Sequence, residues 1–449
     1  MRFVNSARRR ENDVEEGRPG LPTFREAFLF WLKLGFISFG GPTGQIAMMH
    51  QELVERRKWI SEARFLHALN YCMLLPGPEA QQLATYVGWL LHRTRGGIAA
   101  GALFVLPSVF VLWTLSSVYV VFGKIAWVAA LFYGLKPAVL AIVVSAVIRI
   151  GSKALKNEVM WSLAALAFVS IFFLKVPFPI IIVAAGLIGL AGGKMWPAKF
   201  LVAKEHGGKG ATTVIADNEE SAQHTKPSLV RAVKVCAVCL ALWWAPVVLV
   251  GAWLGWNHTV FREGVFFSKA AMVTFGGAYA VLPYVSQQAV EQFGWLNAGQ
   301  MLDGLGLAET TPGPLIMVLQ FVGFMGGWQH PGQLSPLLAG TLGALVTTWT
   351  TFVPCFLWIF LGGPHIEQLR GNAKLTAALS AVTAAVVGVV LNLAVWFGLH
   401  VLFPARGQVD WFTVVVGAVA FAGMVKWKWD VVPVVLGGAL LGLIYKMVL

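Results

Sequence analysis

The chain has 449 residues, of which 57% are hydrophobic and 12% are charged. A soluble domain of ordinary proportions cannot bury that much apolar surface, so the composition excludes a water-soluble globular protein and indicates a membrane protein. The formal net charge is +13, but the basic residues stand mostly in short loops between apolar runs, which is the pattern that orients membrane helices. No nucleic-acid partner is therefore expected.

The first residues are polar and basic. Residues 1–23 include Arg8, Arg9 and Arg10 and contain no apolar core, so they do not form a cleaved signal peptide. We expect them to be a cytoplasmic tail.

The first half, residues 24–194, contains two kinds of apolar segment. Segments 24–49 and 62–92 are interrupted by Gly or Pro, whereas four later runs approach the twenty residues that a membrane-spanning helix needs. These four expected spans are 97–122, 125–150, 159–175 and 178–194.

A polar stretch over 195–228 has a Gly-rich start and no sustained apolar face, and we expect it to be a cytoplasmic linker. Residues 229–256 follow as a connecting transmembrane helix. The second half, 257–449, again begins with two interrupted segments, 262–283 and 301–329. Its expected spans are 335–361, 375–401, 410–425 and 431–448.

The two halves repeat the same punctuation at a constant offset. Subtraction gives 269 − 33 = 236 for two lysines, 275 − 39 = 236 for two Phe-Gly-Gly breaks and 312 − 76 = 236 for two Pro-Gly-Pro breaks. Internal duplication with paired helix breaks is how many transporters build a site at the middle of the bilayer. The fold class is therefore predicted to be an all-α polytopic membrane protein made of two inverted homologous halves.

Charge supports the inversion. The loop 50–64 carries Arg56, Arg57, Lys58 and Arg64, whereas 284–361 contains no Lys or Arg. By the positive-inside bias the first loop faces the cytoplasm and its counterpart faces outward, with a cytoplasmic N-terminus and a periplasmic C-terminus. The chain crosses nine times if the four interrupted segments dip in and return, and thirteen times if they all span. The bias favours segments that return.

The Pro-Gly-Pro breaks are the predicted binding elements. Two prolines remove two backbone donors and the glycine frees its dihedrals, so one helix ends and another starts. A helix start carries about half a positive charge and directs N–H groups outward, which makes it a natural anion site. The candidate anion-contacting residues at these two breaks are Pro76, Gly77 and Pro78, and Pro312, Gly313 and Pro314.

The Phe-Gly-Gly breaks supply further candidates. Lysines in apolar sequence are expensive and functional by default, although snorkelling to the interface is the alternative. The neighbouring hydroxyls can donate to an anion or bond back to their own helix, and the glycines permit close approach of either a ligand or another helix. These candidates are Lys33, Ser38, Gly40 and Gly41, and Lys269, Thr274, Gly276 and Gly277.

Acidic residues distinguish the two Pro-Gly-Pro breaks. Glu79 directly follows the first break and Glu309 precedes the second by three residues. Each either satisfies free amides as a cap or exchanges a proton as the anion moves.

Enzyme chemistry finds no support in the sequence. The nine histidines are scattered, no nucleophile or cofactor spacing appears, and the four cysteines (Cys72, Cys236, Cys239 and Cys355) lie in apolar stretches where packing is favoured. We expect no enzyme activity, no metal and no cofactor.

The repeated words resemble the chromate ion transporter family, in its long, two-half ChrA-type form. The matching residues are Phe39, Gly40 and Gly41 with Pro76, Gly77 and Pro78, and Phe275, Gly276 and Gly277 with Pro312, Gly313 and Pro314. The resemblance implies export of chromate across a bacterial inner membrane, with sulfate as a competitor or alternative substrate and coupling to a proton or charge gradient. An oxyanion channel is the alternative, since pores also use half-helix dipoles. The expected partners are chromate or sulfate and the lipid bilayer, and a homodimer is compatible with the sequence.

Overall fold

The computed structural model describes residues 21–39, 41–201, 228–365, 372–404 and 408–448, and within these ranges the chain is helical throughout. The helices are, in chain order, α2 (Phe24–Ile37), α3 (Gly41–His50), the π-helical turn η1 (Gln51–Arg56), α4 (Glu62–Leu74), α5 (Glu79–Phe122), α6 (Ala126–Ala154), α7 (Glu158–Phe172), α8 (Phe178–Met195), α9 (Pro197–Phe200), α10 (Leu229–Leu254), α11 (Thr259–Val273), α12 (Ala278–Ser286), the π-helical turn η3 (Gln287–Gln292), α13 (Ala298–Thr310), the 3₁₀ turn η4 (Leu315–Met317), α14 (Val318–Gln329), α15 (Pro336–Gly362), the 3₁₀ turn η5 (Gly363–His365), α17 (Ala373–Leu402), α18 (Trp411–Lys426) and α19 (Val431–Val448). The predicted all-α polytopic membrane fold is confirmed.

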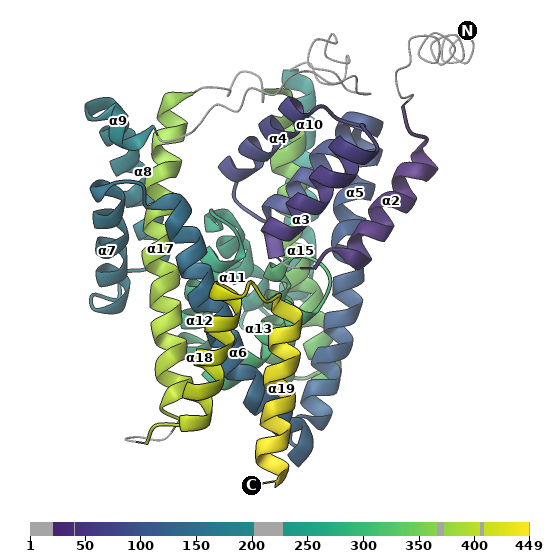
Figure 1. The fold of residues 1–449 in the computed structure, drawn as a ribbon. Coiled ribbons are helices and arrows are strands. Elements are labelled where there is room, and N and C mark those ends of the chain that lie inside the picture. The colour runs from purple at the N-terminus through teal and green to yellow at the C-terminus, as the bar shows by residue number, and fades with distance from the viewer. Residues whose placement is uncertain (1–20, 40, 202–227, 366–371, 405–407, 449) are drawn as a thin grey trace.

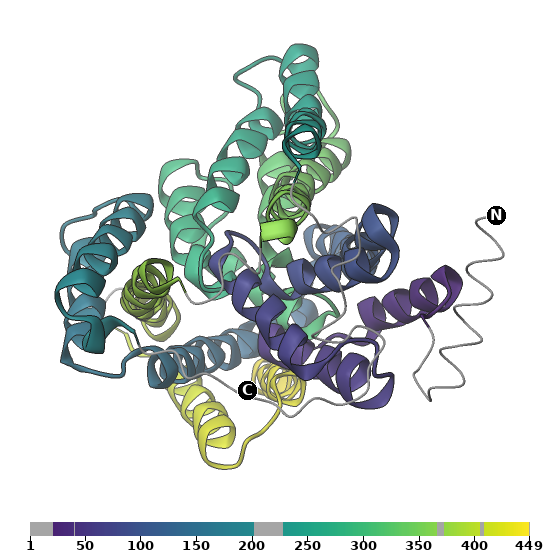
Figure 2. The same cartoon turned by 90° about the horizontal axis from the view of Figure 1, so that it is seen from above.

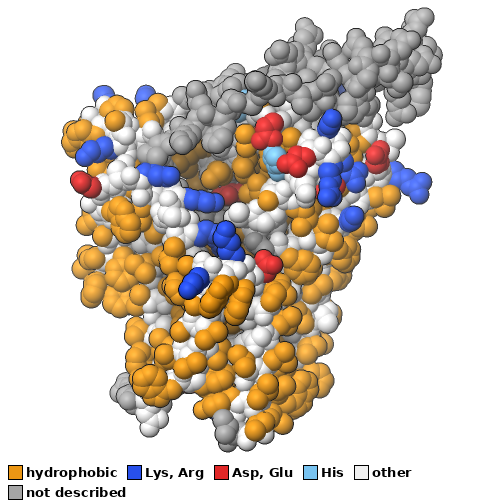
Figure 3. Space-filling model, in the orientation of Figure 1, with side chains coloured by type: hydrophobic (Ala, Val, Ile, Leu, Met, Phe, Trp, Pro, Cys, Tyr) orange, Lys and Arg blue, Asp and Glu red, His pale blue; other side chains and the backbone are white. Residues whose placement is uncertain are grey.

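Seven of the described helices are long and apolar enough to cross a membrane: α5, α6, α8, α10, α15, α17 and α19. Helices α7 and α18 are apolar but shorter. Eight of the nine spans expected from the sequence coincide with helices whose ends differ by only a few residues, and the ninth, 97–122, falls in the part of α5 that follows Arg93. The hydrophobic face in Figure 3 is what a lipid-exposed surface requires, since large apolar side chains such as Trp161 and Leu249 remain exposed.

Helix α5 contains a reversal. His92 and Arg93 have non-helical backbone dihedrals, and Arg93 has φ = +54°. The two legs on either side pack closely, because a Cβ added to Gly88 would lie 2.5 Å from the carbonyl oxygen of Gly96 and 2.6 Å from the Cβ of Ala100. The first leg therefore runs back against the second.

The helix bounds of the two halves repeat at the same offset as the sequence motifs. For η1 and η3 the offsets are 287 − 51 = 236 and 292 − 56 = 236, and for α4 and α13 they are 298 − 62 = 236 and 310 − 74 = 236. Later elements shift to a second offset, since 431 − 178 = 253 and 448 − 195 = 253 for α8 and α19. Equivalent turns also keep unusual backbone conformations: Lys175 and Lys428 have φ of +53° and +55°.

Local signals explain why the helices start where they do. Ser61 accepts a hydrogen bond from the Arg64 amide at the start of α4, and Asn297 accepts one from the Gln300 amide at the start of α13. The second start is a complete capping box, because the Gln300 side chain also accepts from the Asn297 amide. The interrupted segments thus consist of separately capped short helices.

The short helices of the two halves occupy different levels of the molecule. In Figure 1, α2, α3 and α4 lie in the upper part, whereas α11, α12 and α13 lie at mid-height and below, and α19 ends at the bottom. Seen from above, α7 and α8 lie at one edge, α10 at another and the yellow helices α18 and α19 on a third side, around a centre where purple first-half helices meet green second-half helices (Figure 2).

The first half continues further than expected. Helix α8 runs to Met195 and α9 places Phe200, which is 1% exposed, in a cluster with Met160 and Ala377. The packed structure therefore extends past residue 194. Residues 202–227 of the predicted linker, and residues 1–20 of the predicted tail, lie outside the described residues.

Candidate functional site

The two Pro-Gly-Pro breaks each bond to the Phe-Gly-Gly break of the other half. The Gly77 amide donates to the Thr274 carbonyl at 2.7 Å, and the Gly313 amide donates to the Ser38 carbonyl at 2.8 Å. The two hydrogen bonds are equivalent under the repeat, since 313 − 77 = 236 and 274 − 38 = 236. The structure thus brings all four breaks together in a region that we call the crossing: residues 38, 39, 41, 75–79, 274–277 and 311–315.

Glycine is required at the centre of each Pro-Gly-Pro break. Gly77 has φ = +120° and Gly313 has φ = +104°, a region that L side chains rarely adopt. Space is also absent, because a Cβ on Gly77 would lie 2.8 Å from the Cys355 sulfur, and one on Gly313 would collide with the Ser108 hydroxyl. Gly41, Gly276 and Gly277 also have positive φ, and Gly40 lies outside the described residues.

Side chains tie the crossing together. The Gln45 amide nitrogen donates to the Gly313 carbonyl at 2.6 Å and to the Ser38 carbonyl at 3.2 Å, which links the two halves. The Ser108 hydroxyl donates to the Pro312 carbonyl at 2.5 Å, and the Gln82 amide nitrogen donates to the Pro76 carbonyl at 2.8 Å. These bonds satisfy carbonyls that the helix breaks release inside the membrane.

The two hydroxyls beside the Phe-Gly-Gly breaks behave differently. Thr274 Oγ1 donates to the Ala270 carbonyl in its own helix, which is the alternative role considered from the sequence. Ser38 Oγ is buried and has no hydrogen-bond partner in the described part of the chain. Ser38 therefore keeps a free donor at the crossing, whereas Thr274 does not.

The structure leaves both matched lysines on the surface of their helices. Lys33 in α2 and Lys269 in α11 are exposed, and neither makes an ion pair or hydrogen bond with another described residue. Both stay available to an anion or to the membrane interface.

The two acidic candidates have different environments. Glu309 in α13 is 6% exposed and accepts a hydrogen bond from the Tyr279 hydroxyl of α12. Glu79 is the first residue of α5, is half-buried and makes no hydrogen bond to the amides of that helix start. Glu79 is thus not acting as a cap.

A second polar group lies towards the lower end of the molecule. Asp303 in α13 is 4% exposed, accepts a hydrogen bond from the Tyr119 hydroxyl at 2.8 Å and lies 3.7 Å from the Lys136 ammonium. Lys136 also lines a small cavity of about 110 Å³ together with Tyr133, His400 and Asp410. The sequence analysis did not identify Asp303, whose signal was an acid inside an interrupted apolar segment.

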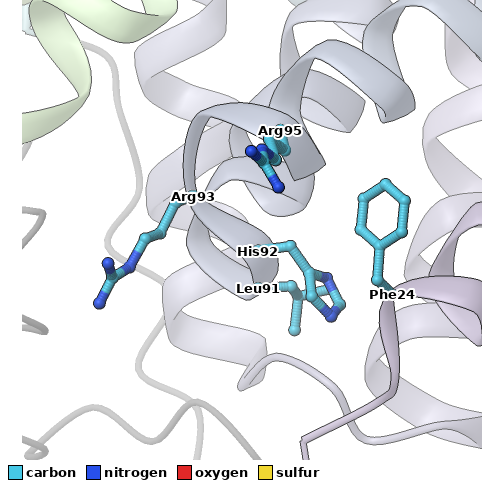
Figure 4. A pocket seen from close by; sticks show the side chains of 5 residues that line it. All are labelled: Phe24, Leu91, His92, Arg93 and Arg95. Atoms are coloured by element: carbon cyan, nitrogen blue, oxygen red, sulfur yellow. The ribbon is translucent and has the colours of Figure 1, made fainter.

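A larger pocket of about 450 Å³ lies at the reversal of α5. It is lined by Phe24, Leu91, His92, Arg93 and Arg95, and Figure 4 shows Arg93 directed away from His92 and Phe24. The His92 imidazole contacts the Pro22 carbonyl at 2.9 Å. At 1.5 Å per residue the thirteen-residue first leg of α5 places this pocket about 20 Å from the crossing, so it is a separate feature.

The sequence analysis missed three residues that bond to the crossing or to Glu309 beside it: Gln45, Ser108 and Tyr279. The signal available for Gln45 was an amide side chain four residues after a Gly-Gly break, and for Tyr279 it was the position two residues after the second Gly-Gly. Ser108 had no signal, because serine is common in membrane helices. Among the described residues no group of three or more His, Cys, Asp or Glu side chains could hold a metal, and the four cysteines are free thiols.

Comparison with known proteins gives consistent matches. The family model described as "Chromate transporter" matches residues 25–190 and 262–443, which are the two halves. A chromate transport protein of Cupriavidus metallidurans (strain ATCC 43123 / DSM 2839 / NBRC 102507 / CH34) is 29% identical over 428 residues, covering 94% of this chain and 93% of the relative. A chromate transport protein of Pseudomonas aeruginosa is 32% identical over 380 residues, covering 84% and 81%.

A probable chromate transport protein of Synechococcus elongatus (strain ATCC 33912 / PCC 7942 / FACHB-805) is 27% identical over 400 residues, covering 89% of this chain and 88% of the relative. No solved structure matches the chain.

Proposed function

Because the chain belongs to the chromate transporter family, we propose that it is a secondary transporter that exports chromate from the cytoplasm across a bacterial inner membrane. Sulfate, a tetrahedral dianion of similar size, is the second substrate. Transport is coupled to the proton or charge gradient, and one half moves relative to the other.

The observation that carries this proposal is the crossing. The Gly77–Thr274 and Gly313–Ser38 hydrogen bonds join each Pro-Gly-Pro break, where a helix starts, to the residue that ends a helix of the other half. Helix starts attract anions, and inside a membrane they are shielded from water. A site of this kind at the interface between two repeats is what alternating access requires, because motion of one half changes the access to a fixed position.

The proposed orientation rests on charge. Lys and Arg side chains gather in the upper part of the face in Figure 3, and the lower third of that face is almost entirely hydrophobic. With the upper end in the cytoplasm, the described start of α2 lies inside and the end of α19 lies in the periplasm. The halves are then inverted, with α2 to α4 entering from one side and α11 to α13 from the other.

Proton coupling is assigned to the two acids near the breaks. Glu79 is half-buried and makes no hydrogen bond to the amides of its helix start, and Glu309 is buried with a single neutral donor, the Tyr279 hydroxyl. A carboxylate inside the membrane is costly unless it is paired or protonated. A proton on either residue removes a negative charge from the path of a dianion.

The test is uphill flux in proteoliposomes. We expect the purified full-length protein to move chromate or ³⁵S-sulfate against its concentration gradient when a membrane potential or a pH gradient is imposed, and to stop when an ionophore collapses the gradient. Protein-free vesicles are the control. Flux of both anions that only ever runs downhill would establish the channel alternative, and absence of any flux would contradict transport of either anion.

A further inference from the structure

Gln81 is a buried polar side chain whose polar atoms are not used in the packing of the folded protein. It is fully buried, and neither its Oε1 nor its Nε2 has a hydrogen-bond partner among the described residues. A buried carboxamide without partners destabilises the folded protein, because its polar atoms lose their bonds to water and gain none in return. Such a group is retained where something else completes it.

Gln81 belongs to the first turn of α5, at the end of the first Pro-Gly-Pro break. Pro78 stands at the cap position and offers no side-chain acceptor to the helix start. The first accepted amide is that of Gln82, which donates to the Pro78 carbonyl at 3.1 Å. The preceding amides, of Glu79, Ala80 and Gln81, therefore lie next to the free carboxamide and point in the direction in which helix starts bind anions.

Neighbouring contacts show where Gln81 lies relative to the second leg of α5. Thr85, one turn later on the same side of α5, donates to the Gln81 carbonyl at 2.8 Å and packs against Gly101 of the second leg. The two legs run antiparallel, and Thr85 lies beside Gly101, so residue numbers that face each other add up to about 186. Gln81, four residues before Thr85, therefore lies level with residue 105, four residues after Gly101. Ser108, three residues further, donates to the Pro312 carbonyl of the second break. Because helical side chains lean towards the helix start, Gln81 lies beside the first break, close to the level at which the second leg contacts the second break.

The second half has no equivalent donors. The positions matched to Gln45, Gln81 and Gln82 are Val281, Met317 and Val318, since each differs by 236. All three are buried and apolar, and the second break opens into the short 3₁₀ turn η4, whose residues are Leu315, Ile316 and Met317. The second half thus keeps the Pro-Gly-Pro backbone of the first break but has apolar residues in place of its three glutamines.

We infer that the oxyanion binds at the first break alone, held by the start of α5 and by the Gln81 carboxamide, and that the second break serves to hold the halves together. This inference rests on the proposed function and narrows its site from two breaks to one. The ligand class is a tetrahedral oxyanion recognised by uncharged N–H donors. Gln45 and Gln82 already donate to backbone carbonyls, so Gln81 is the glutamine that remains for the ligand.

The test is equilibrium binding to the full-length protein in lipid nanodiscs, with ³⁵S-sulfate as the probe and chromate as competitor. Gln81→Met places the residue of the second break in the first, and Met317→Leu is the matched control. We expect Gln81→Met to weaken sulfate binding at least about tenfold, as loss of a hydrogen bond to a charged group does. Met317→Leu is expected to stay within about twofold of the wild type.

Thermal unfolding without ligand separates a binding role from a structural one. Removing an unpaired buried carboxamide leaves the Tm of ligand-free Gln81→Met unchanged or higher, whereas loss of a structural contact lowers it. Added sulfate should raise the Tm of the wild type and of Met317→Leu, and leave that of Gln81→Met nearly unchanged.

Wild-type sulfate binding by Gln81→Met, equal weakening by Met317→Leu, or a lower ligand-free Tm for Gln81→Met would each overturn the one-sided site while the proposed function stands. A wild-type protein that binds neither sulfate nor chromate would overturn the proposed function and this inference together.

Discussion

The amide of Gly77 in the first half donates to the carbonyl of Thr274 in the second, and the repeat returns the same bond from Gly313 to Ser38. Each half therefore supplies a donor that only the other half can satisfy. A backbone amide without an acceptor inside a membrane costs several kcal/mol, so these two bonds help to fix the position of one half against the other.

The central glycines of the breaks should not tolerate a side chain. Gly77→Ala and Gly313→Ala each combine a positive φ with a steric conflict, at Cys355 and at Ser108. We expect each substitution to lower stability by about 1–3 kcal/mol, measured as a lower Tm and a smaller monodisperse fraction in detergent. Gly255→Ala is the control, because Gly255 has φ = +96° but open space around it. If Gly255→Ala is equally damaging, backbone strain alone explains the loss.

The matched lysines are expected to matter for transport more than for folding. Lys33 and Lys269 are exposed and make no described ion pair, so Lys33→Ala and Lys269→Ala should leave the Tm within about 1 °C of the wild type. We predict that each reduces the initial rate of sulfate flux in proteoliposomes severalfold, because a positive charge near the path is lost. Wild-type flux rates at equal protein density would show that both lysines only extend to the membrane interface and have no role in transport.

The Lys136–Asp303 pair should be energetically coupled. Asp303 is 4% exposed, so Lys136→Ala leaves a buried carboxylate with only the Tyr119 hydroxyl as donor. We expect a loss on the order of 2 kcal/mol in stability, and a smaller loss in the double variant Lys136→Ala with Asp303→Asn. The exposed Lys124→Ala serves as control and should change the Tm little. Simple additivity of the two single substitutions would show that the pair is not coupled.

Packing of α19 against α6 should depend on Gly442 but not on Gly437, which lies in the same helix. A Cβ on Gly442 would lie 2.6 Å from the Ala130 carbonyl oxygen, whereas nothing lies within 4 Å of one on Gly437. Small residues at such contacts let membrane helices approach closely. Gly442→Val should therefore destabilise the protein by a few kcal/mol and Gly437→Val should not, as judged by Tm. Equal effects of the two would mean that α19 does not hold this position in the membrane.

Glu79→Gln is predicted to change the pH dependence of transport. A neutral amide cannot exchange a proton, so flux that depends on protonation of Glu79 becomes less sensitive to pH across the range in which wild-type flux varies. The measurement is the initial sulfate flux against pH under a fixed membrane potential. Glu158→Gln, at the exposed first position of α7, is the control. An unchanged profile in Glu79→Gln would remove this residue from the coupling mechanism.

Periodicity and length were sufficient to predict most of the fold. Membrane spans such as 178–194 and 431–448 were visible because uninterrupted apolar runs of about twenty residues are rare outside membrane helices, and the offset of 236 located all four breaks. The breaks came from Pro and Gly, whose backbone effects are local and therefore readable in sequence.

The contacts across the halves were not readable in the same way. The Gln45–Gly313 and Ser108–Pro312 bonds join positions that only the folded chain brings together, and glutamine or serine in an apolar run does not reveal its partner. The bounds of the first half were also set by tertiary packing, since Phe200 is buried by residues of α7 and α17 rather than by its neighbours in sequence.

The reciprocal pairing of the breaks constrains how such a molecule can arise. A single half carries the Gly77 donor and the Ser38 acceptor but cannot join them to one another in the observed way, so it would need a second copy to complete its interior. One polypeptide that contains both repeats supplies the two copies at a fixed one-to-one ratio, and under the orientation proposed above α10 lets them insert in opposite senses. Once joined, the copies were free to diverge, and the matched positions Gln81 and Met317 record that divergence.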